Sequence, residues 1–146
     1  MECDEIMEWL HDYGLNIKTV NDNNFTIASA REVYCPGHQF VPSKMLEKLK
    51  SGYTETIEKG YKGLRVTGEM SWAIKGIPGS EKIIEYESLV NTIYPDYPVT
   101  AVCQYNVNDF SGAMIMNVLK VHPKMIAKGR ILENPYYIKP EIFFRG

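Results

Sequence analysis

The chain has 146 residues, of which 45% are hydrophobic and 23% are charged, and its formal net charge is -2. This length suffices for one domain with its own core, and the scattered basic residues form no cluster for nucleic acid. No apolar run is long enough to span a bilayer, and the acidic amino-terminal stretch is unlike a signal peptide. We therefore predict a single cytoplasmic domain over residues 1–146 that contacts neither nucleic acid nor membrane directly.

The three cysteines, Cys3, Cys35 and Cys103, are far apart and belong to no CxxC or Cys/His motif. Such spacing is not typical of a zinc site or of a disulfide framework. The sequence therefore predicts reduced thiols, no metal and no cofactor, with Cys103 buried in a strand.

The first half of the chain alternates between helical and strand patterns. An apolar stripe predicts a helix over residues 4–13, and a strand is predicted over residues 25–34. Ser43 is expected to cap the next helix, which ends near Lys59. This helix leads directly into a second strand over residues 63–72, which gives a strand, helix, strand unit.

The strand predicted over residues 63–72 is the one around which the rest of the chain is organised. Its apolar and polar residues alternate, and Arg65 and Glu69 lie on the polar face. Polar side chains at the carboxyl end of a strand, followed by a helix, occupy the usual ligand position of open α/β sheets. We therefore expect a ligand site near Glu69, Ser71 and Trp72.

The second half of the chain continues the alternation. A helix is predicted over residues 80–94, and the nearly apolar strand over residues 98–106 is expected to be covered on both faces. Asp109 is expected to cap a helix that ends at His122, and one more strand is predicted around residues 129–132. The fold class is therefore predicted to be α/β, with three layers and a mainly parallel sheet flanked by helices.

The carboxyl ends of parallel strands meet at one edge of a sheet, so the polar side chains there should share a crevice with an aromatic wall. Alternatively, Trp72 is a core anchor and Glu69 an ordinary surface carboxylate. The predicted ligand-binding residues are Tyr34, Arg65, Glu69, Ser71, Trp72, Gln104, Tyr105, His122 and Tyr137.

Catalytic patterns are weak. The sequence has no GxxxxGK[ST] loop, GxGxxG turn, GxSxG elbow or HExxH pair. Glu69 and Glu87 could act as paired carboxylates, but a solvated or ion-paired Glu87 is favoured. Cys103 as a nucleophile would need His38 or His122 as its base, and an inert buried thiol is favoured instead.

Two residues near the carboxyl terminus have simple structural interpretations. His122 lies at a helix end, where the helix dipole favours a protonated imidazole. Asn134 precedes Pro135, and its amide is expected to point toward backbone groups. Both residues are therefore explained without a ligand, although His122 also lies near the NPYY turn.

Several motifs together resemble a known family. In chain order they are GLRVTGEMSW, EYESLVN, VCQYN, HPKMI and ENPYY. They are similar to the MEDS domain, the sensory domain shared by methanogen and methylotroph regulators, over most of the chain from about Glu5 to Tyr137. The resemblance implies a core like the RecA-like fold of the circadian-clock ATPases and a small-molecule signal. The first strand and the phosphate loop of such a core have no counterpart here, so ATP hydrolysis is not expected.

The resemblance and the weak catalytic patterns predict a non-catalytic sensory domain. It would bind a small molecule and signal to a regulatory protein partner in transcription regulation. The alternatives are a nucleotide-hydrolase-like enzyme that uses Glu69 as its base, and a structural partner domain. A missing first strand would leave a sheet edge exposed, and pairing of that edge with a second copy predicts a homodimer.

Overall fold

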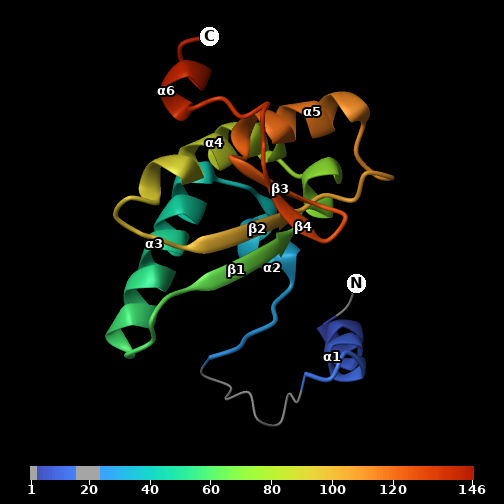
Figure 1. The fold of residues 1–146 in the computed structure, drawn as a ribbon, viewed down its shortest axis with the longest axis vertical. Helices are drawn as coiled ribbons and strands as arrows, with labels where there is room; N and C mark the ends of the chain where they lie inside the picture. The colour runs from blue at the N-terminus through green and yellow to red at the C-terminus, as the bar shows by residue number, and fades with distance from the viewer. Residues whose placement is uncertain (1–2, 16–23) are drawn as a thin grey trace.

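The computed structural model describes residues 3–15 and 24–146 and has a mixed α/β architecture (Figure 1). Its elements are, in chain order, α1 (Cys3–Asp12), α2 (Ala30–Tyr34), the 3₁₀ helix η2 (Pro36–His38), α3 (Pro42–Glu58), β1 (Arg65–Glu69), the 3₁₀ helices η3 (Ser71–Ile74) and η4 (Ser80–Lys82), α4 (Ile83–Ile93), β2 (Thr100–Gln104), α5 (Gly112–Val121), β3 (Lys124–Ala127), β4 (Arg130–Glu133) and α6 (Pro140–Phe143).

The central sheet is a pair of parallel strands. Arg65 of β1 pairs with Thr100 of β2, and Glu69 pairs with Gln104 at the other end. Helix α4 belongs to the crossover that a parallel pair requires. Strands β3 and β4 form a separate antiparallel hairpin. The mixed α/β class is therefore confirmed, with a smaller parallel sheet than the sequence led us to expect.

The core lies against one face of this sheet, which helices α3 and α4 help to cover (Figure 1). Met70 and Trp72, directly after β1, are 0% and 3% exposed. The Trp72 ring stacks on Tyr34 with centroids 5.0 Å apart and contacts Phe40 at 4.9 Å. Trp72 is therefore an anchor of the core, one of the two roles that the sequence allowed.

The strand predicted over residues 25–34 is wrong. Residues 25–29 have no regular structure, and Ala30–Tyr34 form the short helix α2. Ala30, Arg31 and Glu32 favour helix over strand, and they outweigh the short alternating pattern before them. Helix α2 nevertheless brings the Tyr34 ring to the core.

The helices predicted to start at Ser43, at residue 80 and at Asp109 are confirmed as α3, α4 and α5, but two caps differ from expectation. Helix α3 begins at Pro42, whose fixed φ suits the first turn of a helix, so Ser43 lies inside it. Helix α5 is capped by Ser111, whose Oγ accepts a hydrogen bond from the Met114 backbone nitrogen at 3.2 Å. Asp109 instead accepts a hydrogen bond from the Asn106 side-chain amide.

The expectation that β2 is covered on both faces is also wrong. Exposure alternates along both strands, as it does in a sheet with one face toward solvent. Here, the inner face consists of Val66, Gly68, Ala101 and Cys103, and the outer face of Arg65, Thr67, Glu69, Thr100, Val102 and Gln104.

Helix α1 confirms the predicted first helix. Its Trp9 side chain is 55% exposed and contacts Tyr13, which is 75% exposed, with ring centroids 4.6 Å apart. No helix formed by residues 3–15 and 24–146 combines the length and apolar character that a membrane crossing requires.

Candidate functional site

Three polar side chains from separate elements converge beneath the inner face of the sheet. Glu87 on α4, Cys103 on β2 and His122 at the end of α5 each offer one atom that could bind a metal, and these atoms lie within 4.8 Å of one another. The Glu87 Oε2 and His122 Nε2 atoms are 3.8 Å apart. We call these three residues the Glu–Cys–His cluster.

Each member is placed by a simple local rule. Glu87 lies on the buried side of α4, next to Tyr86 and one turn from Ile83 and Val90. Cys103 faces inward because side chains alternate along β2. His122 is the carboxyl-terminal cap of α5, which ends there because Pro123 follows.

The imidazole of His122 has a fixed orientation. Its Nδ1 lies 2.7 Å from the Val118 carbonyl oxygen, and a carbonyl can only accept, so Nδ1 carries a proton. In the neutral ring, Nε2 is then the atom with a free lone pair, and it faces Glu87. The His122 side chain is 24% exposed, so solvent reaches the cluster from this side.

The Glu87 carboxyl is buried and lacks hydrogen bonds. The residue is 4% exposed, and neither carboxyl oxygen has a hydrogen-bond partner within the described part of the chain. Burial raises its pKa, while the nearby His122, Tyr105 hydroxyl and Cys103 thiol act in the opposite direction. The Tyr105 hydroxyl is near enough to influence the carboxyl, yet its geometry falls short of a hydrogen bond. Buried polar groups are normally satisfied, so these atoms identify a candidate site.

The Cys103 thiol completes the cluster in its uncharged form. Burial raises the pKa of Cys103 well above its usual value, and the nearby Glu87 raises it further. A thiolate here would therefore need a cation beside it.

Asn134 holds the backbone around the cluster. Its Nδ2 donates hydrogen bonds to the carbonyl oxygens of Leu119, at 2.6 Å, and His122, at 2.7 Å. Its Oδ1 accepts from the Tyr136 backbone nitrogen at 3.0 Å. The predicted role of Asn134, an amide directed at backbone groups, is therefore confirmed, and one of those groups belongs to His122.

Four of the predicted ligand-binding residues lie on or beside the outer face. The Glu69 carboxylate accepts hydrogen bonds from the Ser71 backbone nitrogen and hydroxyl, both at 2.8 Å. The Gln104 Nε2 donates to the Thr67 hydroxyl at 2.7 Å. Arg65 is at the opposite end of β1 from Glu69. Arg65, Glu69 and Gln104 are exposed and Ser71 is partly buried, and the Glu69 and Gln104 side chains have partners on the same face.

Tyr34, Trp72, Tyr105 and His122 of the predicted site lie on the inner side. Tyr34 and Trp72 stack on each other in the core. Tyr105 contacts His122, with ring centroids 6.4 Å apart. Tyr137 is partly buried, which raises its pKa, as does nearby Glu141. The structure thus brings Tyr105 and His122 together and places Glu69 and Gln104 on the other face of the sheet.

Glu87 and Cys103 were considered in the sequence analysis but were not included among the predicted ligand-binding residues. A carboxylate between apolar neighbours in the stretch IIEYESLV was the available signal, because an ordinary surface helix keeps its charges on the outward side. His122 does lie beside Cys103, whereas His38 is exposed and bonded to Arg31.

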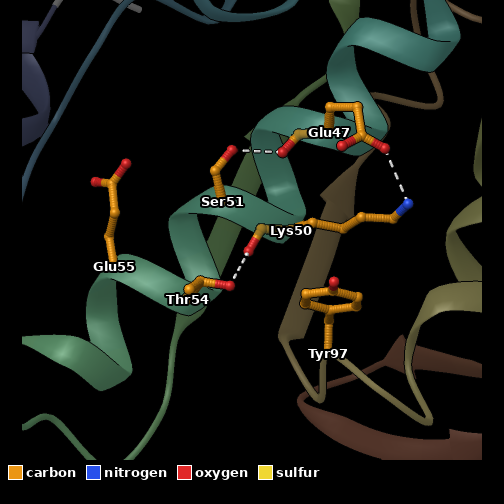
Figure 2. Close-up of a pocket in the computed structure, with 6 residues that line it drawn as sticks. All are labelled: Glu47, Lys50, Ser51, Thr54, Glu55 and Tyr97. Atoms are coloured by element: carbon orange, nitrogen blue, oxygen red, sulfur yellow. Dashed lines mark hydrogen bonds and ion pairs between the residues drawn. The ribbon is translucent and has the colours of Figure 1, made fainter.

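An open surface hollow lies over α3 (Figure 2). Its lining residues are Glu47, Lys50, Ser51, Thr54, Glu55 and Tyr97. Lys50 is paired with Glu47 at 2.9 Å and lies over the Tyr97 ring at 5.9 Å. The Ser51 and Thr54 hydroxyls donate to carbonyl oxygens of their own helix. Because its lysine and hydroxyls already have partners, this hollow is a weaker candidate than the cluster.

Comparison with known proteins identifies the family. The family model MEDS, the MEthanogen/methylotroph, DcmR Sensory domain, matches residues 1–123. The chain belongs to the MEDS family. The resemblance seen in its motifs is thereby confirmed over residues 1–123, whereas the ENPYY motif lies beyond the match. The whole Glu–Cys–His cluster lies inside the match, and Asn134 lies beyond it.

A curated relative connects the MEDS domain to gene regulation. The transcriptional repressor DcmR of Methylorubrum extorquens is 32% identical to this chain over 81 residues. The alignment covers 55% of this chain and 31% of the repressor, so the chain spans less than a third of that relative's length. No solved structure matches the chain.

Proposed function

We propose that this MEDS domain is a non-catalytic sensor that binds a small molecule at the Glu–Cys–His cluster and signals to a regulatory partner. The observation that carries the proposal is the buried Glu87 carboxyl, which has no hydrogen-bond partner among the described residues. A ligand that supplies the missing contacts would relieve a cost of about 1–3 kcal/mol per buried polar group. The name of the family and the repressor relative support a sensory role in transcription regulation.

The predicted ligand-binding residues divide into two groups in this proposal. Tyr105 and His122 would contact the ligand, and Tyr34 and Trp72 would support the site from the core. The residues of the outer face, Arg65, Glu69, Ser71 and Gln104, together with Tyr137, remain predicted contacts that a ligand test must examine separately.

Signalling would follow from the position of the cluster between three elements. Glu87, Cys103 and His122 come from α4, β2 and α5, so a ligand that all three contact favours one spacing of these elements. A ligand with different affinities for two arrangements shifts the population between them. That shift is the signal a regulatory partner would read.

The nucleotide-hydrolase alternative has less support. Glu69 would have to act as a general base, but its carboxylate already accepts two hydrogen bonds from Ser71. The sequence also has no phosphate-binding loop to hold a nucleotide. A RecA-like core remains part of the proposal, supported by the parallel β1–β2 pair with α4 in its crossover.

A homodimer is the proposed assembly. Within the described residues, β1 and β2 pair only with each other, so each has one edge without a strand partner. Exposed strand edges can pair with a second copy of the chain. A monomer measured by light scattering at micromolar concentration would contradict this assembly.

A thermal-shift screen of small metabolites tests the sensory function. We expect at least one compound to raise the Tm of the wild type and of the outer-face control Glu69→Gln, but not of Glu87→Gln. A ligand at a hundred times its Kd stabilises a protein by about 2.7 kcal/mol, which is several degrees for a chain of this size. A compound that raises the Tm of the wild type and of Glu87→Gln, but not of Glu69→Gln, would show that the binding site is on the outer face. If no compound discriminates the variants, the sensory proposal is contradicted.

A further inference from the structure

We propose that the Glu–Cys–His cluster is a zinc site. Glu87, Cys103 Sγ and His122 Nε2 would bind one Zn²⁺ and leave the fourth coordination position to the signal molecule. The assignment of that fourth position rests on the proposed sensory function, whereas the three protein ligands are argued from their own geometry.

The separations suit a tetrahedral ion. With zinc–ligand bonds of about 2.0–2.3 Å, neighbouring ligand atoms lie roughly 3.3–3.8 Å apart. The Glu87 and His122 atoms are 3.8 Å apart, too far for a direct hydrogen bond and about 0.5 Å more than an oxygen and a nitrogen ligand of one Zn²⁺ require. All ligand atoms lie within 4.8 Å of one another, so about 1 Å of side-chain movement closes the site.

His122 has the second hydrogen bond that zinc-binding histidines commonly make. A ligating histidine usually donates its other ring N–H to a carboxylate or a backbone carbonyl, which fixes the ring for the metal. The Nδ1–H of His122 does this with the Val118 carbonyl oxygen at 2.7 Å. In the neutral ring, the Nε2 atom with its lone pair lies 3.8 Å from the Glu87 carboxyl, and two acceptors this close are stabilised by a cation or a proton between them.

The donor atoms and their charges also favour zinc. Thiolate and imidazole ligands suit Zn²⁺, whereas Mg²⁺ and Ca²⁺ prefer oxygen ligands. The Glu87 carboxylate and the Cys103 thiolate together carry two negative charges, which a Zn²⁺ ion neutralises. Bound zinc would therefore offset the cost of burying Glu87, and it would hold Cys103 deprotonated.

An open coordination position follows from the number of ligands. Sites with three protein ligands typically hold a water or a substrate in the fourth position. The Tyr105 hydroxyl is buried without a partner beside Glu87, so it could donate a hydrogen bond to a molecule bound there. The partly exposed His122 side chain marks the side from which the ion and the molecule would enter.

An ion pair between Glu87 and a protonated His122 is the competing explanation. It accounts for the Glu87–His122 distance but gives no role to Cys103. Detection of a metal–thiolate bond at Cys103 therefore separates the two explanations.

The test uses the chain freed of metal by dialysis against a chelator. Zn²⁺ is titrated in competition with a chromophoric indicator, and Co²⁺ is then substituted as a spectroscopic probe. We expect one Zn²⁺ per chain, intense visible absorption from tetrahedral Co²⁺, and a thiolate-to-cobalt charge-transfer band in the near ultraviolet. Absence of that band in the wild type would overturn the zinc site.

Variants assign the ligands. Cys103→Ser should abolish the charge-transfer band, and Glu87→Gln and His122→Gln should each weaken zinc binding tenfold or more. The matched controls Cys3→Ser, Cys35→Ser and His38→Gln should bind zinc as the wild type does. A band that persists in Cys103→Ser would overturn the assignment. If Cys103→Ser does not fold, the two cysteine controls still test the assignment. Loss of the charge-transfer band in Cys3→Ser or Cys35→Ser would overturn it, and a band that is retained in both would support Cys103 as the thiolate ligand.

Zinc uptake is measured without any signal molecule. A failure to bind zinc would therefore overturn this inference and leave the sensory proposal standing. Conversely, a failed metabolite screen would not affect the three zinc ligands.

Discussion

The two faces of the β1–β2 sheet differ in how their polar groups are satisfied. On the outer face, Gln104 is bonded to Thr67 and Glu69 to Ser71, all at 2.7–2.8 Å and all near solvent. On the inner side, Glu87 is 4% exposed and has no hydrogen bond within the described chain. An exposed polar residue costs little, whereas a buried one without a partner costs several kcal/mol and calls for a functional reason. The inner side is therefore the better place to look for chemistry.

The largest expected effect concerns the backbone that holds the inner site. Asn134→Ala removes the donor to the carbonyl oxygens of Leu119 and His122, so we expect the free energy of unfolding to fall by about 2–4 kcal/mol. Urea denaturation measures this change. Asn117→Ala, on the exposed side of α5, is the matched control and should change it by less than about 0.5 kcal/mol. If Asn134→Ala and Asn117→Ala changed the free energy of unfolding equally, the hydrogen bonds of Asn134 would not stabilise the backbone around the cluster.

An intermediate effect is expected where β1 meets the core. A Cβ atom at Gly68 would overlap the Tyr34 hydroxyl, so Gly68→Ala should displace the ring that stacks on Trp72. Overpacking of this kind typically costs about 1–3 kcal/mol. Thermal unfolding and the near-ultraviolet circular dichroism of the aromatic residues report the change. At Gly63 an added Cβ meets no atom within 4 Å, so Gly63→Ala should leave the aromatic signal unchanged.

The smallest expected effect is the change in stability on replacing a glutamate by glutamine, at Glu87 on the inner side or at Glu69 on the outer face. Folding raises the pKa of Glu87, so its stabilising contribution is present below the pKa of the unfolded chain and is lost as pH rises through the folded pKa. In chelator at neutral pH, Glu87→Gln removes this buried ionisable group and should stabilise the protein by about 1 kcal/mol, or about 2–4 °C in Tm. Glu69→Gln, which weakens exposed hydrogen bonds to Ser71, should lower the Tm slightly.

Added Zn²⁺ should reverse the order of the Tm values of Glu87→Gln and Glu69→Gln. The wild type and Glu69→Gln would gain stability from the ion, and Glu87→Gln would gain much less. A Glu87→Gln variant that is less stable than the wild type in chelator would show that the pair with His122 outweighs the cost of burial.

Local patterns predicted much of the fold. The helices α3, α4 and α5 follow from apolar stripes, and β1 and β2 from alternation or apolar runs between turns. The MEDS motifs were also recognisable in the sequence. A strand was wrongly predicted over residues 25–34 because the alternating pattern there is short and three helix-forming residues follow it. Strand β3 was missed because its four residues belong to a hairpin that only pairing with β4 defines.

The candidate site was harder to predict than the fold. Its three members lie on α4, β2 and α5, so no fixed spacing like that of a CxxC motif connects them. The sequence assigned His122 to the site but treated Cys103 as inert, since their proximity depends on how α5 packs beside the sheet. The rule that ligands bind at strand ends identified Tyr105, yet strand alternation put Glu69 and Gln104 on the opposite face.

His122 also belongs to two parts of the molecule at once. Its ring faces the buried carboxyl, while its own carbonyl oxygen accepts the hydrogen bond from Asn134, directly after β4. The His122 backbone therefore links the buried cluster to the β3–β4 hairpin, whose Ile126 and Ile131 are 59% and 71% exposed. If an ion or ligand bound at the cluster shifts the His122 backbone, the same peptide unit transmits that shift to the exposed apolar residues of the hairpin.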